Sequence, residues 1–227
     1  MTISITARCP ETGQFGIAIS SSSIAVGARC PWLHAGVGAV SSQNITLPAL
    51  GQKILEKLES GMTPDQAMKV ALSEDQYSGY RQVTVIDSNG ATACFSGTET
   101  LGVHNMVTGD NCVAAGNMLD NREVIDAMVS CFEESSGELT SRLIAALQAG
   151  IDKGGEAGPE HSAAVKVVDD YTWPLVDLRV DWADDQPVAE LLKLWQDYEP
   201  QMQAYVTRAL DPRKAPGYGV PGDDKAV

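Results

Sequence analysis

Polar and apolar residues alternate over residues 2–8, which is the pattern of a half-buried strand. Turn-forming Pro and Gly in residues 9–13 separate this segment from a second strand pattern at 15–20. The chain is therefore predicted to open with a β-hairpin. A run of small residues at 35–42 predicts another strand, in which glycines allow close backbone approach.

Later segments switch between helical and strand periodicity. Apolar residues at helical spacing predict helices at 50–58, from 63 onward, at 124–132, at 139–147, and from 187 towards 205. Thr63, Pro64 and Gln66 predict a capping box at the start of the second helix, and Pro200 predicts an interruption of the last one. A hairpin is predicted at 83–86 and 91–95, and further strands at 103–107, 112–115, 162–168 and 176–180.

This order of elements favours an α+β fold, because blocks of strands alternate with pairs of helices. Consecutive hairpins indicate antiparallel pairing, and helices from separate blocks are placed to cover both faces of the strands. We expect one domain over residues 1–210. Residues 211–227 hold several Pro and Gly residues and are expected to form an irregular tail.

Charge and composition narrow the classes of function. The 227 residues include 16 Lys and Arg against 30 Asp and Glu, so the formal charge is 16 − 30 = −14. This argues against nucleic-acid and anionic-membrane partners. No apolar run reaches the roughly 20 residues of a membrane helix, and we expect no signal peptide. The five cysteines have no metal-ligand spacing and favour reduced thiols in a cytoplasmic protein.

Several stretches together resemble the bacterial and archaeal family catalogued as domain of unknown function 1028, which is placed in the N-terminal-nucleophile hydrolase superfamily. These stretches are residues 2–8, 16–19, 25–28, 31–32, 35–40, 116–119, 162–164 and 176–181, within a span from residue 2 to about residue 195. The resemblance implies a four-layer αββα sandwich and an amide-bond hydrolase, with no particular substrate. Family members often carry Lys-Phe-Phe where this chain has Ser22-Ser23-Ile24, so a Lys-assisted mechanism is in doubt.

Thr2 is the candidate nucleophile. Removal of Met1 would leave Thr2 with a hydroxyl and a free α-amine, and an adjacent amine can take the hydroxyl proton. The α-amine has a reference pKa of about 8, close to working pH. The alternative is that Thr2 only begins a strand.

Amide side chains are the candidate donors to the oxyanion of an amide-hydrolysis intermediate. Gln43 and Asn44 follow the small-residue strand, and Asn117 lies in the Gly-Asn-Met-Leu stretch. Each of them is equally consistent with a residue that ties down a turn. The candidate substrate-binding residues are Ser22, Ser23, His161 and Ser162.

We therefore predict an amidohydrolase that acts on a small non-peptide or short-peptide amide, with no metal and no cofactor. The three histidines, His34, His104 and His161, show no metal-ligand spacing. The alternative is a non-catalytic member of the same fold that binds a small ligand or has a structural role. Apolar residues Trp195, Tyr198 and Tyr205 indicate either helix packing or a contact between copies, and we expect a homo-oligomer.

Overall fold

Ten strands form two antiparallel sheets in the computed structural model, which describes residues 1–222. The six-stranded sheet has the order β10-β9-β2-β1-β8-β7, and the four-stranded sheet has the order β3-β4-β5-β6. The six-stranded sheet comprises β1 (Thr2–Arg8), β2 (Phe15–Ser21), β7 (Asn105–Gly109), β8 (Cys112–Asn117), β9 (Ser162–Val168) and β10 (Val176–Val180). The four-stranded sheet comprises β3 (Pro31–His34), β4 (Gly38–Asn44), β5 (Arg81–Asp87) and β6 (Thr92–Ser96).

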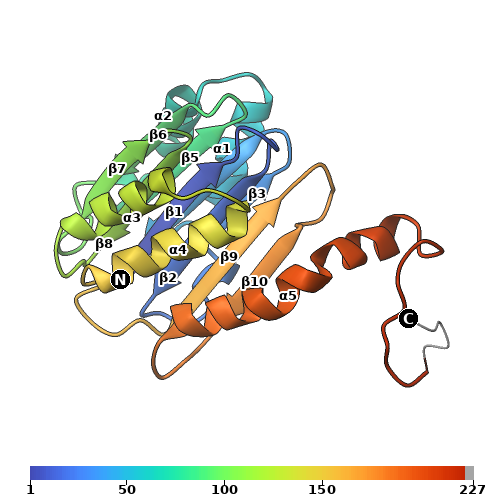
Figure 1. The fold of residues 1–227 in the computed structure, drawn as a ribbon. Helices are drawn as coiled ribbons and strands as arrows, with labels where there is room; N and C mark the ends of the chain where they lie inside the picture. Colours follow the sequence, from blue (N-terminus) through green and yellow to red (C-terminus); the bar gives the residue numbers. More distant parts are fainter. Residues whose placement is uncertain (223–227) are drawn as a thin grey trace.

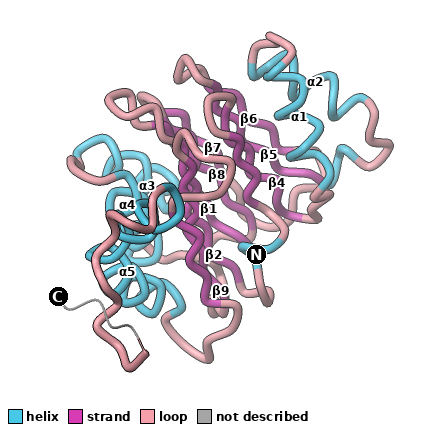
Figure 2. The backbone as a smooth tube through the Cα atoms, turned by 90° about the vertical axis from the view of Figure 1, so that its right-hand side faces the viewer, coloured by secondary structure: helices cyan, strands magenta, loops and turns pink. Residues whose placement is uncertain are grey.

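Two groups of helices lie on opposite sides of the strands (Figures 1 and 2). Helices α1 (Ala49–Glu59) and α2 (Pro64–Ser73) contact the four-stranded sheet. Helices α3 (Glu123–Glu134), α4 (Leu139–Asp152) and α5 (Pro187–Leu210) contact the six-stranded sheet. Short 3-10 helices cover Val26–Ala28 and Ser78–Tyr80. The two sheets also contact each other, for example through β1 with β4 and β5 with β8.

Polar and apolar side chains alternate along β1, and this alternation determines which part of the protein each face of the strand contacts. Ile3, Ile5 and Ala7 belong to the large apolar cluster formed with α3, α4 and α5. Successive side chains on a strand point to opposite faces, so Thr2, Ser4 and Thr6 point towards the four-stranded sheet. The contacts agree, because Ser4 bonds to Gln43 on β4 and Thr6 bonds to Thr84 on β5.

The layer between the two sheets changes character along its length. Near the end of β1 that carries Arg8, it holds a small apolar cluster of Phe15, Ile17, Ala39, Ile86 and Val168. Near Thr2 it is filled by buried polar side chains. These are Thr2, Ser4, Ser21, Ser41, Gln43, Gln82 and Asn117. We call them the apolar end and the polar end of the inter-sheet layer.

Two local predictions are confirmed in detail. The β5–β6 hairpin turns at Asp87-Ser88-Asn89-Gly90, with Gly90 at φ +80° and its N–H donating to the Asp87 carbonyl. The capping box at α2 is present, with Thr63 accepting from the Gln66 N–H and the Gln66 side chain accepting from the Thr63 N–H. In addition, all five cysteines are free.

Two other predictions are wrong. The segment 35–42 is not one strand, because β3 and β4 form a hairpin whose turn includes Gly36 at φ +73°. Pro200 does not interrupt the last helix, and α5 runs through it. Proline removes only one backbone donor, and buried residues on both sides of it, Trp195 and Val206, hold the helix against the sheet. Trp195 and Tyr198 thus contribute to helix packing.

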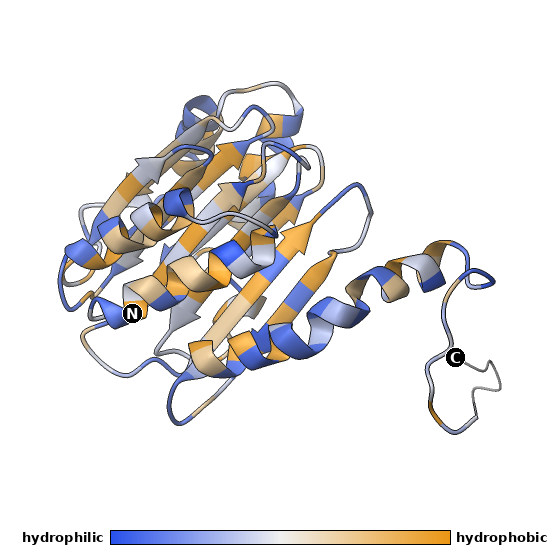
Figure 3. Cartoon of the chain, in the orientation of Figure 1, coloured by the Kyte–Doolittle hydropathy of each residue, from blue (hydrophilic) through white to orange (hydrophobic). Residues whose placement is uncertain are grey.

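The final segment has no helix or strand over the residues described after α5, up to 222. The rest of the predicted tail, 223–227, lies outside the described residues. In Figure 3, β9 and β10 are largely coloured as hydrophobic, whereas α5 carries mixed colours towards its C-terminal end. Within residues 1–222, no helix has the length and apolar character needed to cross a membrane.

Candidate functional site

Thr2 is the first residue of β1, a central strand that pairs with β2 on one side and β8 on the other. Its partner across β8 is Asn117. The Thr2 residue is only 5% exposed, and its hydroxyl oxygen lies 3.4 Å from the hydroxyl oxygen of Ser21 at the end of β2. Sheet pairing therefore brings together three polar side chains from three strands at one end of the inter-sheet layer.

The carbonyl group of Met1 lies inside this group of polar side chains. Its oxygen accepts hydrogen bonds from both Thr2 Oγ1 and Ser21 Oγ. The Met1 side chain extends towards Gly158, where a Cβ built on the glycine would lie 2.8 Å from Cε of Met1. The N-terminal residue thus presents a carbonyl to the Thr2 hydroxyl, and the Thr2 nitrogen is held in the Met1–Thr2 peptide bond.

Glu156 is a buried carboxyl group beside this site. It lies in the loop between α4 and β9, it is 5% exposed, and its Oε2 accepts from the Ser22 N–H at 3.0 Å. Its Oε1 is buried and has no hydrogen-bond partner among the described residues. Burial, with a smaller contribution from Glu160, raises the pKa of Glu156 to about 8, although the N-terminal ammonium and Ser22 lower it.

The sequence patterns did not identify Glu156. The loop that carries it follows Gly154 and Gly155, both at positive φ, and a single bridge pairs Glu156 with Leu119. Two adjacent glycines in a loop signal an unusual backbone path, but they do not indicate where that path leads. Ser21 was not among the predicted site residues, although residues 20–23 form a polar run that could line a pocket. Its strand position has the same parity as Ile17 and Ile19, which indicates the face it occupies.

Gln43 lies in the polar end of the layer with its hydrogen-bonding capacity in use. Its Nε2 donates to Gln82 Oε1 at 2.8 Å and to the Ala115 carbonyl at 3.2 Å. Its Oε1 accepts from Ser4 and Ser41. Because both amide hydrogens have acceptors, Gln43 fits a residue that orders the network better than one that donates to a substrate.

Asn117 is placed differently from Gln43. Its Nδ2 donates to Gln82 Oε1 at 3.1 Å, and its Oδ1 is buried without a hydrogen-bond partner among the described residues. A primary amide has two N–H donors, and one described bond accounts for one of them. Asn117 faces Thr2 directly across the β1–β8 pair, so it is the amide with donor capacity next to the hydroxyl.

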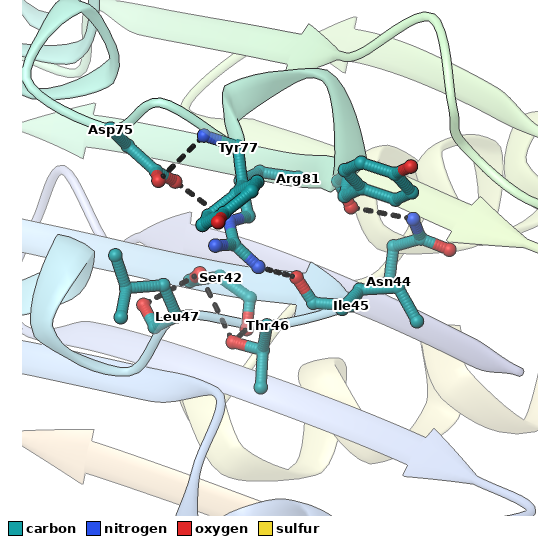
Figure 4. Close-up of polar contacts among 9 residues, drawn as sticks. Ser42, Asn44, Ile45, Thr46, Leu47, Asp75, Tyr77 and Arg81 are labelled. Carbon is teal, nitrogen blue, oxygen red and sulfur yellow. Dashed lines mark hydrogen bonds and ion pairs between the residues drawn. The ribbon is translucent and has the colours of Figure 1, made fainter.

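Asn44 is tied into a turn at the end of β4, as Figure 4 shows. Its Nδ2 donates to the Tyr80 carbonyl at 2.6 Å, and its Oδ1 accepts from the Leu101 N–H. Its φ of +67° is left-handed, a conformation that Asn tolerates better than most residues. Nearby, Arg81 forms a buried ion pair with Asp75 and donates to the Ile45 carbonyl (Figure 4).

The serine run, residues 20–23, connects to Thr2 through hydroxyl contacts. Ser21 Oγ lies 2.8 Å from Ser23 Oγ, and Arg29 donates to Ser23 Oγ at 3.3 Å. A cationic side chain is therefore linked to Thr2 only through two serines. The backbone of Ser22 contributes through its bond to Glu156.

Ser162 and His161 hold the surrounding backbone. Ser162 Oγ donates to the Ser23 carbonyl at 2.6 Å and accepts from the Val26 N–H. The His161 N–H donates to the Ser21 carbonyl, while its ring contacts the Ala183 carbonyl and stacks on Trp182 with centroids 4.3 Å apart. Both residues therefore position the serine run.

Two of the buried cysteines, Cys30 and Cys112, are poor candidates for a nucleophile at neutral pH. Burial raises the pKa of Cys30 to about 11 and, together with Glu133, that of Cys112 to about 12. These two thiols are therefore protonated at neutral pH. Over residues 1–222, no three His, Cys, Asp or Glu side chains are grouped so that they could hold a metal ion.

Comparison with known proteins places the chain in a family. The model of a family of unknown function, DUF1028, matches residues 2–191. The crystal structure of protein SPO2555 from Silicibacter pomeroyi, which carries the same family label, has a TM-score of 0.82 and 33% identity, covering 87% of this chain and 85% of that chain. No protein of curated function matches.

More distant similarity is found to Anbu, the ancestral beta-subunit. Anbu from Yersinia bercovieri has a TM-score of 0.41 and 11% identity, covering 89% of this chain and 97% of that chain. An Anbu mutant from Hyphomicrobium sp. strain MC1 has a TM-score of 0.42 and 14% identity, covering 91% and 99%. Similarity at this level does not extend to function.

Proposed function

Since the chain belongs to the DUF1028 family of unknown function, we propose its activity from the geometry around Thr2: it is an amidohydrolase with an N-terminal threonine nucleophile. The observation that supports this most is the contact of Thr2 Oγ1 and Ser21 Oγ with one carbonyl oxygen, that of Met1. A hydroxyl nucleophile and a second hydroxyl donor thus already surround a carbonyl group. Acyl transfer needs this combination of nucleophile and carbonyl-binding donor.

Removal of Met1 makes the chemistry possible. The freed α-amine of Thr2 takes the proton from Oγ1, and Oγ1 attacks the carbonyl carbon of the amide substrate. Ser21 Oγ and the second N–H of Asn117 Nδ2 stabilise the negative oxygen that develops. The ammonium then returns the proton to the leaving nitrogen as the C–N bond breaks, and an ester at Thr2 Oγ1 remains. Water, activated by the same amine, hydrolyses that ester.

The roles of the other predicted residues follow from their contacts. Gln43 and Gln82 hold Asn117 in place, because Gln82 Oε1 accepts from both amides. Ser162 and His161 hold the serine run through its backbone. We assign Asn44 no contact with the substrate, since both atoms of its amide are engaged in a turn.

We further propose that the two sheets and the two groups of helices form the four-layer αββα sandwich of the N-terminal-nucleophile hydrolases. Contacts between facing strands and contacts of each group of helices with one sheet support this. In such an arrangement, residues between the sheets at the N-terminal end of β1 form the site. The homo-oligomer stays a prediction, which the mass of the native protein in solution tests.

The test of function uses protein released from a fusion by a protease that leaves Thr2 as the first residue, with its intact mass measured. We expect this protein to hydrolyse members of a panel of small amides, amino acid amides and dipeptides. The Thr2→Ala variant should lose at least about 1,000-fold in kcat/KM, because it has no nucleophile. The Thr2→Ser variant should keep part of the activity.

The matched control is Thr108→Ala, which removes an exposed threonine from β7 of the same sheet. Its turnover should equal that of the parent protein. Equal turnover by Thr2→Ala and the parent would disprove the mechanism. If the Thr2-first protein hydrolyses no amide in the panel, ligand binding becomes the function that the site supports.

A further inference from the structure

The carbonyl group and the side chain of Met1 each contact a separate part of the protein. Its carbonyl oxygen accepts from Thr2 Oγ1 and Ser21 Oγ. Its side chain reaches Gly158, where an added Cβ would lie 2.8 Å from Cε of Met1 and would require the end of that side chain to shift. Its α-ammonium opposes the rise in the pKa of the Glu156 carboxyl group, and Glu156 Oε1 is left without a hydrogen-bond partner among residues 1–222. The carbonyl group and the side chain of one aminoacyl group are thus each matched by a separate feature of the protein, and a buried carboxyl group with a free oxygen lies beside them.

The proposed reaction relates this position of Met1 to an intermediate of catalysis. A methionyl group on Thr2 N is the retained N-terminus, and the same group on Thr2 Oγ1 is the acyl-enzyme formed from a methionyl amide. The two species are isomers that differ only in which atom of Thr2 carries the carbonyl carbon. The contacts of Met1 therefore approximate those of the acyl group of a bound substrate.

Glu156 has a free carboxyl oxygen to which an ammonium group can donate, and a cation bound beside a carboxyl group favours its ionised form. It is 5% exposed, it is held by the Ser22 N–H, and its Oε1 has no hydrogen-bond partner within residues 1–222. Burying a carboxyl oxygen without a hydrogen-bond donor costs free energy, and a bound donor removes that cost. Ser21 touches the Met1 carbonyl and the next residue, Ser22, touches Glu156. A carbonyl group and an α-ammonium in one small molecule can therefore engage both sites.

We propose that the place of Met1 is the acyl subsite, and that it accepts an aminoacyl group whose free α-ammonium binds to Glu156. The substrate class is then amides of amino acids, or short peptides with an unblocked N-terminus, and N-acylated amides are disfavoured. Gly158 sets the room for the side chain of that residue. This inference rests on the proposed function, because it names the substrate of the same site.

The first experiment measures binding and needs no turnover. It uses the Thr2→Ala variant with residue 2 as its first residue, and calorimetric titration with L-methioninamide or N-acetyl-L-methioninamide. We expect the free amine to bind at least about 10-fold more tightly. Glu156→Gln should abolish this preference. Glu138→Gln is the matched control, since it changes a partly buried carboxyl at the far end of α4 and should leave the preference intact.

Three results would overturn the inference. One is equal binding of the two ligands, and another is binding of neither. The third is a Glu156→Gln variant that weakens both ligands by the same factor, because Glu156 would then position the N-terminus and not the ligand. A preference for the free amine without turnover of any amide by the Thr2-first protein would leave the subsite standing and remove the hydrolase proposal.

The second experiment tests whether Gly158 limits the space for the side chain of the acyl residue. Gly158 is not at positive φ, so Ala fits its backbone. In the Thr2-first protein, Gly158→Ala should lower kcat/KM for methionyl p-nitroanilide at least about 5-fold relative to alanyl p-nitroanilide. An unchanged ratio would show that the acyl side chain lies elsewhere.

Discussion

The two ends of the inter-sheet layer share strands β2, β4 and β5 and differ in what they bury. At the apolar end, Phe15, Ile17 and Ile86 pack without polar atoms between them. At the polar end, Ser4, Gln43, Gln82 and Asn117 are buried to the same extent and are joined by hydrogen bonds. Burial alone therefore does not separate them. The difference lies in whether each side chain needs a partner.

This difference separates stability from function. Apolar burial stabilises the fold by roughly 25 cal/mol for each Å² removed from water, whereas a buried hydrogen bond contributes only about 1 kcal/mol net. A polar end is thus a poor way to join two sheets. It is a good way to hold donors and acceptors in fixed positions. Two of the buried acceptors without a partner among residues 1–222, Asn117 Oδ1 and Glu156 Oε1, belong to residues that flank the N-terminus.

The largest effect on stability should come from the apolar end. Phe15→Ala removes a side chain that is 1% exposed, and it should lower the free energy of unfolding by about 3–5 kcal/mol. Turnover per folded molecule should not change, because Phe15 faces Arg8 at the opposite end of the β1–β2 pair from Thr2. Denaturant unfolding and kcat/KM at a temperature where the variant is folded measure the two quantities. If Phe15→Ala lost as much turnover as the polar-end variants, the apolar end could not be assigned to stability alone.

A smaller loss of stability with a large loss of turnover is expected for Gln82→Leu. Gln82 Oε1 accepts from both Gln43 and Asn117, so leucine leaves two buried N–H groups without an acceptor. The free energy of unfolding should fall by about 2–4 kcal/mol, since each unsatisfied group costs about 1–3 kcal/mol. Turnover should fall because Asn117 is no longer held. Thr84→Val, on the same face of β5, breaks one bond to Thr6 and should leave turnover intact.

The sequence predicted the elements better than it predicted the site. Alternation over residues 2–8 places Thr2, Ser4 and Thr6 on one face, and the structure agrees through their partners on the other sheet. The hairpin at Asp87–Gly90 and the cap at Thr63 depend on local chemistry, and both are present. Pro200 was misjudged because local preference for a helix break was outweighed by packing of α5 on the sheet.

Contacts between segments that are far apart in the sequence could not be predicted from the sequence patterns. Gln43 faces Gln82 across β4 and β5, but two helices separate these strands in the sequence, so their register cannot be read from a turn. Glu156 meets Ser22 across 134 residues. The position of its loop depends on where α4 ends and β9 begins in space, and the hydrophobic periodicity of the sequence does not predict that. The family resemblance supplied Thr2, and the structure supplied what surrounds it.

The smallest effect should come from Asn44, a predicted site residue that belongs to neither end of the layer. Asn44→Ala loses its bonds to Tyr80 and Leu101 and places alanine at φ +67°, a left-handed conformation that asparagine adopts more readily. We expect the free energy of unfolding to fall by about 1–2 kcal/mol, with unchanged turnover. Asn44→Gly accepts this φ and should be more stable than Asn44→Ala at the same loss of side-chain bonds. Denaturant unfolding and kcat/KM of both variants test this. A loss of turnover of 10-fold or more in both would extend the functional site beyond the polar end to the turn after β4.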